Sequence, residues 1–277
     1  MKQRHPFYRK VIVVTGAASG IGLAVCHRFA ADGAVVAMLD MDADALAAAS
    51  AGLTVKGARV STHVCDVTSE SQCRDSIGTV IAQHDGIDLL FNNAGITQRG
   101  AFIDTETAVF HKVMAVNFFG SLYCTKAALH SLIARHGQII VNESIAGIAP
   151  VLGRTGYSAS KHALHGLFTS LRSEIRPTGA HVMIVCPGFI QTNLQRRALG
   201  CDGRVTKHPQ SRVGRQQTPE QAAEAIYQGA RRRRNMVVLT PVGKFSYWLS
   251  RLAPVLFERI QARQLAQELN DHRGNPG

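Results

Sequence analysis

The chain has 277 residues, of which 45% are hydrophobic and 18% are charged, so it can bury a sizeable core and is not disordered across its bulk. It contains no run of about 18 apolar residues, so no membrane-spanning helix is predicted. The formal net charge is +12, and residues 191–277 contribute 15 Lys and Arg against 6 Asp and Glu. This basic last third predicts either a solvated basic face or a contact with nucleic acid, anionic lipid or an anionic substrate.

Two further features of the composition bear on location and metal binding. Residues 1–10 are basic but lack the apolar stretch of a secretion signal. The six cysteines show neither metal-ligand spacing nor a C-x-x-C motif, a pattern typical of reduced thiols. We therefore expect a cytoplasmic protein without a metal site.

Short apolar segments alternate with helical patterns from residue 10 to about residue 240. The apolar segments are rich in Val and Ile and mostly lack polar alternation, which is typical of strands buried on both faces of a parallel sheet. The predicted strands are 10–15, 34–40, 59–65, 87–92, 138–143, 181–186 and 236–239. The predicted helices are 20–31, 43–51, 69–84, 105–135, 157–176 and 219–231. This order predicts an α/β fold, a single-domain Rossmann-like doubly wound parallel sheet of about seven strands with helices on both faces.

Two segments fall outside this alternation. Residues 188–217 lack a clean period and are rich in Gly, Arg and Gln, as is typical of a functional connection. Residues 243–277 form an extension whose helical pattern is interrupted at Pro254. We therefore predict a dinucleotide-binding catalytic domain over 1–242, with a substrate loop at 188–217, followed by an amphipathic helical extension over 243–277.

A Gly-rich turn, Thr-Gly-Ala-Ala-Ser-Gly-Ile-Gly at 15–22, follows the first predicted strand and opens a helix. Glycine allows a tight turn and a close approach of phosphate to the backbone. The helix that follows presents free N–H groups and the positive end of its dipole. The turn therefore predicts a dinucleotide site that includes Gly16, Ser19, Gly20, Ile21 and Gly22.

Asp40 ends the second predicted strand. A carboxylate there can accept hydrogen bonds from both hydroxyls of an adenosine ribose, and it would repel a 2′-phosphate. Neither Ser19 nor Met41 supplies a compensating positive charge. These residues favour NAD over NADP as the cofactor. The alternative is that Asp40 caps the helix that begins near Asp42.

Tyr157 and Lys161 are four residues apart on a predicted helix, so their side chains rise from the same face. The ammonium favours the phenolate and is expected to lower the tyrosine pKa toward neutral, which makes a usable proton-transfer group. Ser144 lies thirteen residues upstream of Tyr157. Together with the Gly-rich turn, these residues predict hydride transfer between a nicotinamide cofactor and an alcohol or ketone.

With these motifs the chain resembles the short-chain dehydrogenase/reductase family. The resemblance spans roughly residues 10–240, in the order and at the spacings of the family. It implies a nicotinamide-dependent oxidoreductase that forms a homodimer or homotetramer. The matching motifs are Thr15-Gly16-x-x-x-Gly20-x-Gly22, Asn92-Asn93-Ala94-Gly95, Asn117, Ser144, Tyr157-x-x-x-Lys161 and Pro187-Gly188.

The resemblance also implies a role for each matching residue. Tyr157 would be the general acid/base, and Lys161 would lower its pKa and bond the nicotinamide ribose. Ser144 would hold the substrate oxygen, and Asn117 would position a water in a proton relay through Lys161. The implied cofactor contacts are Asp66 and Val67 at the adenine, Asn93, Ala94 and Gly95 along the cleft, and Pro187, Gly188, Ile190 and Thr192 at the nicotinamide.

The substrate is expected to meet 145–155, 188–217 and the C-terminal extension. The apolar run Ile148, Ala149, Pro150, Val151 and Leu152 favours a hydrophobic secondary alcohol or ketone. The basic residues of the loop could hold a carboxylate or phosphate, or simply be solvated. They are Arg196, Arg197, Arg204, Lys207, Arg212 and Arg215.

The basic last third leaves several interpretations open. The arginines at 231–234 could suit a helix C-terminus or meet anionic lipid or nucleic acid. Apolar residues over 245–260, near helical spacing and accompanied by basic residues, could contact a membrane surface, close the substrate pocket or pack on another subunit.

An alternative function is an NAD(H)-binding regulatory protein whose basic third contacts nucleic acid or a protein. An intact Ser144, Tyr157 and Lys161 set favours the enzyme, so no nucleic-acid partner is expected. An imine or double-bond substrate also stays open.

Overall fold

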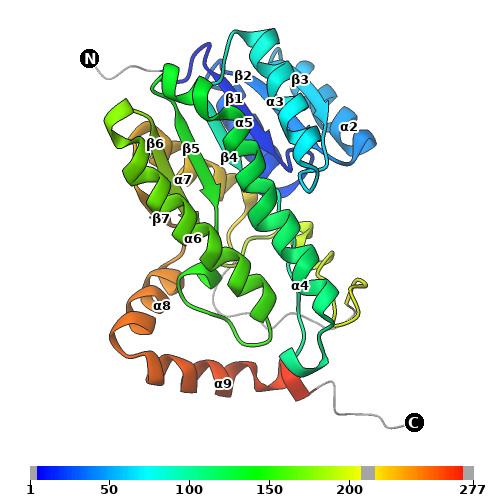
Figure 1. Cartoon of the computed structure of the whole chain (residues 1–277), viewed down its shortest axis with the longest axis vertical. Helices are drawn as coiled ribbons and strands as arrows, with labels where there is room; N and C mark the ends of the chain where they lie inside the picture. Colours follow the sequence, from blue (N-terminus) through cyan, green and yellow to red (C-terminus); the bar gives the residue numbers. More distant parts are fainter. Residues whose placement is uncertain (1–4, 207–215, 271–277) are drawn as a thin grey trace.

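The computed structural model is built around one seven-stranded sheet with helices on both faces (Figure 1). It describes residues 5–206 and 216–270. The strand order is β3-β2-β1-β4-β5-β6-β7, and every neighbouring pair is parallel. The strands are β1 Val11–Thr15, β2 Val35–Asp40, β3 Arg59–Val64, β4 Leu89–Asn92, β5 Gln138–Asn142, β6 His181–Cys186 and β7 Met236–Val238. The order reverses between β1 and β4, the position at which doubly wound sheets bind nucleotides.

The helices before β7 connect successive strands and cover the sheet, and two more helices follow β7. They are α1 Gly20–Ala30, α2 Ala43–Thr54, α3 Glu70–His84, α4 Thr107–Met114, α5 Gly120–Ala134, α6 Thr155–Ile175, α7 Pro219–Arg231, α8 Pro241–Leu252 and α9 Pro254–Asn270. Each predicted strand is confirmed to within two residues, and the predicted α/β fold is confirmed.

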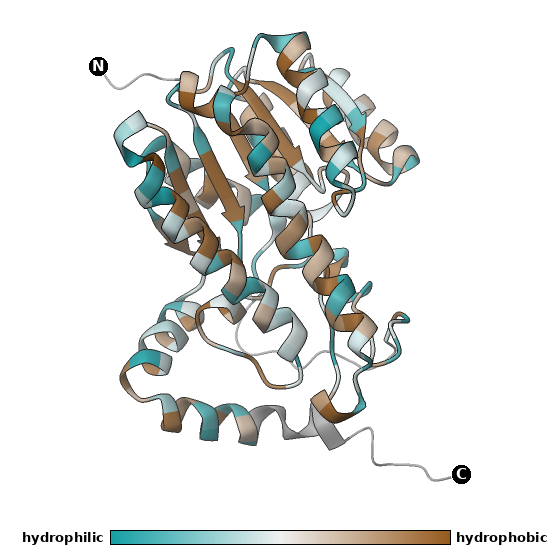
Figure 2. Ribbon diagram, viewed as in Figure 1, coloured by the Kyte–Doolittle hydropathy of each residue, from teal (hydrophilic) through white to brown (hydrophobic). Residues whose placement is uncertain are grey.

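Strand burial explains why the sequence lacks polar alternation. All five residues of β1 are buried, and Val11 and Val13 face one core cluster while Ile12 and Val14 face the other. The central strands are accordingly hydrophobic along their length (Figure 2). The first cluster joins the sheet to α3, α5 and α6, and the second joins it to α1, α2 and α7. The sheet is therefore buried between two hydrophobic clusters, one on each face.

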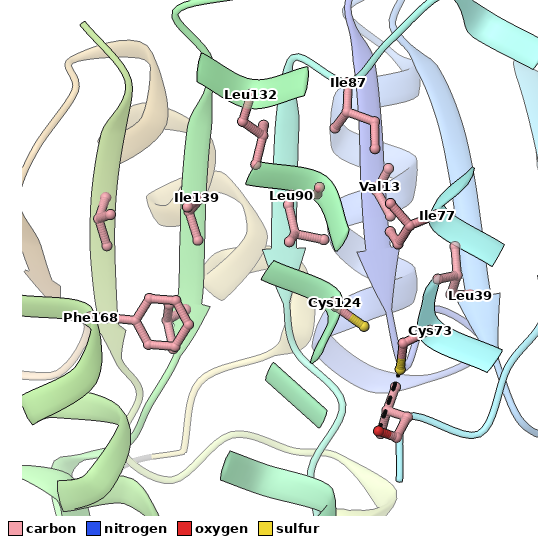
Figure 3. Close-up of a cluster of buried hydrophobic side chains, with 14 of the residues drawn as sticks. Val13, Leu39, Cys73, Ile77, Ile87, Leu90, Cys124, Leu132, Ile139 and Phe168 are labelled. Carbon is pink, nitrogen blue, oxygen red and sulfur yellow. Dashed lines mark hydrogen bonds between the residues drawn. The ribbon is translucent and has the colours of Figure 1, made fainter. Parts of the chain in front are cut away.

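The first cluster contains four of the protein's free thiols, and two of them are labelled in Figure 3. Cys73 on α3 and Cys124 on α5 are fully buried among aliphatic side chains such as Ile77, Leu90 and Leu132. The Cys73 thiol donates a hydrogen bond to the Val67 carbonyl oxygen over 3.5 Å. Interactions with Cys124 and burial raise the pKa of Cys73 to about 12, so it packs as a neutral thiol.

The predicted helix over 105–135 is wrong in one respect, because it is not one uniform α-helix. Between α4 and α5 the chain forms a π-helical turn at Ala115–Phe119. Asn117 lies in this turn and is fully buried. A π-turn inside an α-helix often marks a functional position, since it redirects side chains from the regular helical face.

The last third contains a capped helix and a pair of terminal helices. α7 begins with a capping box between Thr218 and Gln221, and Pro219 is in its first turn. α8 and α9 meet at Pro254 and lie together at one end of the molecule (Figure 1). Across the described residues, no helix is both long enough and apolar enough to span a bilayer.

Candidate active site

A cavity of about 910 Å³ lies at the carboxyl edge of the sheet. Residues that follow each of the seven strands line it, from the Gly-rich turn after β1 to Thr240 after β7. Parallel strands bring segments far apart in sequence to one edge, which is why the predicted site residues meet here. The predicted cofactor residues in the lining are Gly16, Ser19, Gly20, Ile21, Asp40, Asp66, Val67, Asn93, Ala94, Gly95, Tyr157, Lys161, Pro187, Gly188, Ile190 and Thr192.

The Gly-rich turn needs its glycines for backbone geometry. Gly16 and Gly20 have φ values of +62° and +56°, in the left-handed region that glycine adopts without strain. Gly22 does not line the cavity, and a Cβ on it would overlap the Gly16 carbonyl oxygen. Gly22 therefore acts by allowing α1 to pack closely on the turn.

The start of α1 fits a pyrophosphate. Ser19 is its N-cap residue, and no side-chain bond caps the helix. The first N–H groups of α1 are therefore left for an anion, with the positive end of the helix dipole behind them. Asn93 braces the turn from β4, since its Nδ2 donates to the carbonyl oxygens of Thr15 (2.9 Å) and Gly16 (3.1 Å). A nicotinamide dinucleotide would be held by these groups.

Asp40 is held at the mouth of the turn. Its Oδ2 accepts from the Ala18 N–H over 3.0 Å, and its Oδ1 accepts from the Asp42 N–H over 3.2 Å. The alternative that Asp40 caps α2 is wrong, because the N-cap is Asp42, whose side chain accepts from the Ala45 N–H. Each Asp40 oxygen keeps acceptor capacity toward the cavity.

The predicted proton-transfer pair is buried beside the cavity. Tyr157 and Lys161 are 8% and 4% exposed, and the Lys161 Nζ lies 5.7 Å from the centre of the Tyr157 ring. Lys161 Nζ also donates to the Asn142 carbonyl oxygen over 2.8 Å. Ser144 lies close enough to Tyr157 to lower the pKa of its phenol. The structure thus brings Ser144, Tyr157 and Lys161 together on the end of β5 and one face of α6.

Burial, and not the lysine, dominates the titration of this pair. Burial raises the pKa of Tyr157 above its ordinary value, against the opposing effects of the Ser144 hydrogen bond and the Arg154 charge. Burial also lowers the pKa of Lys161 to about 8. The sequence-based expectation that Lys161 brings the Tyr157 pKa toward neutral is therefore wrong for the protein alone. Tyr157 is protonated at neutral pH, as a proton donor must be.

Asn117 acts through neighbouring backbone. Its Oδ1 accepts from the Ile96 N–H (2.8 Å), and its Nδ2 donates to the Ile96 carbonyl oxygen (3.0 Å) and to Ser160 Oγ (2.9 Å). It does not line the cavity. Its side chain therefore ties the segment after β4 to α6, and the water relay stays a prediction.

Sequence reasoning missed Glu143, whose side chain is fully buried next to Ser144. Its carboxylate accepts from the Cys186 thiol and meets His165 Nδ1, each over 3.1 Å. Its negative charge opposes the burial that lowers the pKa of Lys161. One signal was available, because an acidic residue ends a predicted buried strand and stands directly before Ser144.

Sequence reasoning also missed Arg154, which is buried at the start of α6 and lines the cavity. Its positive charge lowers the pKa of Tyr157, against the larger effect of burial.

The other end of the cavity is closed by α8 and α9. Phe245 and Leu249 of α8, with Phe257 and Ile260 of α9, line it. Of the predicted apolar run at 148–152, Val151 alone lines the cavity, while Ile148 and Ala149 are buried.

The basic residues of the predicted substrate loop contribute little to this lining. Arg197 is in it, whereas Arg196 and Arg204 are not. Lys207, Arg212 and Arg215 lie outside the described residues. Within residues 5–206 and 216–270, no group of His, Cys, Asp and Glu side chains could hold a metal ion.

Fold and site together define an oxidoreductase that uses a nicotinamide cofactor. The short chain dehydrogenase profile matches residues 10–199. The chain is 35% identical over 266 residues to dehydrogenase/reductase SDR family member 7B of Bos taurus. This match covers 93% of the present chain and 82% of the bovine protein. It is 33% identical over 268 residues to dehydrogenase/reductase SDR family protein 7-like of Anopheles gambiae. This match covers 94% of the present chain and 84% of the mosquito protein. The protein belongs to the short-chain dehydrogenase/reductase family.

Solved structures agree on the fold. A Burkholderia phymatum short chain dehydrogenase/reductase in complex with NAD superposes with a TM-score of 0.80 at 23% identity, over 90% of this chain and 95% of that one. An alcohol dehydrogenase from Thermococcus sibiricus, complexed with 5-hydroxy-NADP, superposes with a TM-score of 0.72 at 24% identity. The superposition covers 83% of this chain and 95% of that one. The predicted family is thus confirmed, while the homodimer or homotetramer and the cytoplasmic location stay predictions.

Proposed function

We propose that the protein transfers hydride between NAD(H) and a hydrophobic secondary alcohol or ketone. The observation that carries this proposal is the continuity of one cavity. The Gly-rich turn lines one part of it, Ser144 and Tyr157 line another, and apolar residues of α8 and α9 line a third. A substrate oxygen at Tyr157 would therefore have an apolar body against α8 and α9.

The side chains supply orientation and a proton. The bound cofactor supplies a hydride, which carries two electrons to the carbonyl carbon. As negative charge develops on the substrate oxygen, Ser144 and Tyr157 donate hydrogen bonds to it. The Tyr157 O–H bond breaks and its proton completes the alcohol, while the Lys161 ammonium stabilises the phenolate that remains. Oxidation of an alcohol runs through the same groups in reverse.

The preference for NAD rests on the charge around the adenosine end. The lining residues that follow β2 and β3 are Asp40, Met41, Asp42, Cys65, Asp66 and Val67, and none is basic. A 2′-phosphate would meet carboxylates there without a cation. We expect Asp40→Ala to reduce discrimination against NADPH by about tenfold. An unchanged ratio of NADH to NADPH affinity would remove Asp40 from the ribose site.

The test is a fluorescence titration with NADH and NADPH, followed by turnover on a panel of ketones, secondary alcohols, imines and activated double bonds. Tighter NADH binding with turnover of an apolar ketone supports the proposal. Turnover of imines or double bonds alone would overturn the substrate class. Tight NADH binding without any turnover, together with salt-sensitive binding to DNA or RNA, would favour the regulatory protein.

A further inference from the structure

An apolar face on α8 and α9 is open to solvent. Phe245, Trp248 and Leu252 of α8 are 65%, 60% and 78% exposed, and Val255 and Leu256 at the start of α9 are 58% and 51% exposed. The α8 residues are spaced by three and four positions, so they share one side of the helix. We call these five residues the α8–α9 face. Scattered exposed apolar residues are ordinary, but five that include Trp and Phe on adjoining helices mark a contact surface.

Positive charge borders this face. Lys244, Arg251 and Arg259 are exposed on the same two helices. The Arg251 guanidinium lies 4.4 Å from the centre of the Tyr247 ring, which leaves its charge at the helix surface. Glu258 is the one acidic residue in 241–263. Aromatic and aliphatic residues with flanking cations are the composition of a helix that lies in the headgroup region of an anionic membrane.

The face is continuous with the cavity. Phe245 is exposed and also lines the cavity, and Leu249 lies one turn farther along α8 on the cavity side. A hydrophobic molecule dissolved in a bilayer could therefore reach the cavity without crossing water.

We propose that the α8–α9 face docks on the surface of an anionic lipid bilayer and places the mouth of the cavity at the lipid. A second copy of the chain fits this face less well. Symmetric pairing would bring two sets of Lys244, Arg251 and Arg259 together, and like charges at an interface repel. Docking itself does not depend on the proposed function, whereas the delivery of a lipid-soluble substrate does.

Trp248 is the only tryptophan of the chain, so it reports on this face directly. The full-length protein is mixed with vesicles of phosphatidylcholine and phosphatidylglycerol in equal parts, and with vesicles of phosphatidylcholine alone. With the anionic vesicles we expect co-sedimentation, a blue shift of Trp248 emission and quenching by brominated lipid. Added salt should weaken binding, since the attraction to the headgroups is screened.

Two sets of variants test the assignment. The double variant Leu252→Glu/Leu256→Glu should bind anionic vesicles at least about tenfold more weakly, because it places charge in the apolar face. Lys244→Glu should weaken binding by roughly fivefold or more. The matched control is Val55→Glu/Val64→Glu, which alters two apolar residues that are 88% and 59% exposed near the opposite edge of the sheet, and it should bind as the parent does.

Unchanged Trp248 emission with anionic vesicles would overturn the proposal, as would equal binding of the Leu252→Glu/Leu256→Glu variant. A loss of oligomer mass in that variant, without vesicle binding by the parent, would instead assign the face to a subunit contact. Turnover of a water-soluble ketone without vesicles should be unchanged in the double variant. That measurement separates a failure of docking from a failure of the proposed function.

Discussion

The two ends of the cavity are lined by different structural elements. At the cofactor end, the lining residues lie mostly in turns that follow buried strands, and Gly16 and Gly20 adopt left-handed conformations there. At the α8–α9 end, the lining consists of side chains on two helices whose opposite sides are exposed. Changes in the turns act on the sheet to which they are joined, whereas changes on the two terminal helices can alter the lining without disturbing the sheet. Under the proposed function, this difference would place the reaction at the sheet edge and the choice of substrate at α8 and α9.

The largest effect is expected where the two ends meet. Tyr157→Phe removes the proton donor and should lower turnover by about 10²–10⁴-fold. NADH binding should be retained with a much smaller change, because the Gly-rich turn and Asp40 are untouched. Stopped-flow turnover and NADH titration give the two values. Retained turnover would contradict the assignment of Tyr157 as the acid.

Gly22→Ala should damage the cofactor end. Its Cβ would overlap the Gly16 carbonyl oxygen, so the turn must move away from α1. We expect the free energy of unfolding to fall by about 1–3 kcal/mol and NADH affinity to fall by about tenfold.

Gly78→Ala on α3 is the matched control for that variant. No atom lies within 4 Å of the added Cβ, so stability should be unchanged or slightly higher. Chemical denaturation and NADH titration distinguish the two variants. Equal behaviour would show that the turn is looser than the structure indicates.

Leu249→Ala should affect the substrate end alone. It removes apolar surface from the cavity, and we expect KM for an apolar ketone to rise by about fivefold with NADH affinity unchanged. Leu252→Ala is the control on the same helix, since Leu252 is 78% exposed and does not line the cavity. A matching rise in both variants would mean that the effect comes from α8 stability and not from substrate contact.

The smallest effect is expected from Glu143→Gln, and it appears in the pH profile. Reduction needs a protonated Tyr157 and a charged Lys161, so it should fall as the pH rises through the Lys161 pKa of about 8. The Glu143 charge raises the pKa of both groups, and the groups in contact with its carboxylate are His165 and Cys186.

Removing that charge should move the alkaline limit of reduction to lower pH and lower the reduction rate at pH 8 by about threefold. Oxidation, which needs the phenolate, should begin at lower pH for the same reason. Initial rates in both directions across pH give the two profiles. A uniform loss of rate with unmoved limits would point to a merely structural role for Glu143.

Local patterns in the sequence predicted much of this molecule. The seven strands follow from short Val- and Ile-rich segments, because burial on both faces of a parallel sheet demands continuous apolar residues. The Gly-rich turn and the spacing of Tyr157 and Lys161 are also local, since a left-handed turn and one helical face are properties of neighbouring residues. That is why the family and the fold could be predicted.

Tertiary structure decided what depends on several distant segments at once. The carboxylate of Glu143 meets His165 and Cys186 only because β5, α6 and β6 pack together. The closing of the cavity by α8 and α9 depends likewise on where those helices pack. The pKa of Tyr157 is raised because many residues exclude water from it, which no spacing of two residues reveals. The sequence by itself therefore determined the fold, the Gly-rich turn and the spacing of Tyr157 and Lys161. Packing decided the desolvation of these groups and the shape of the substrate end, because both are sums over contacts between segments far apart in the chain.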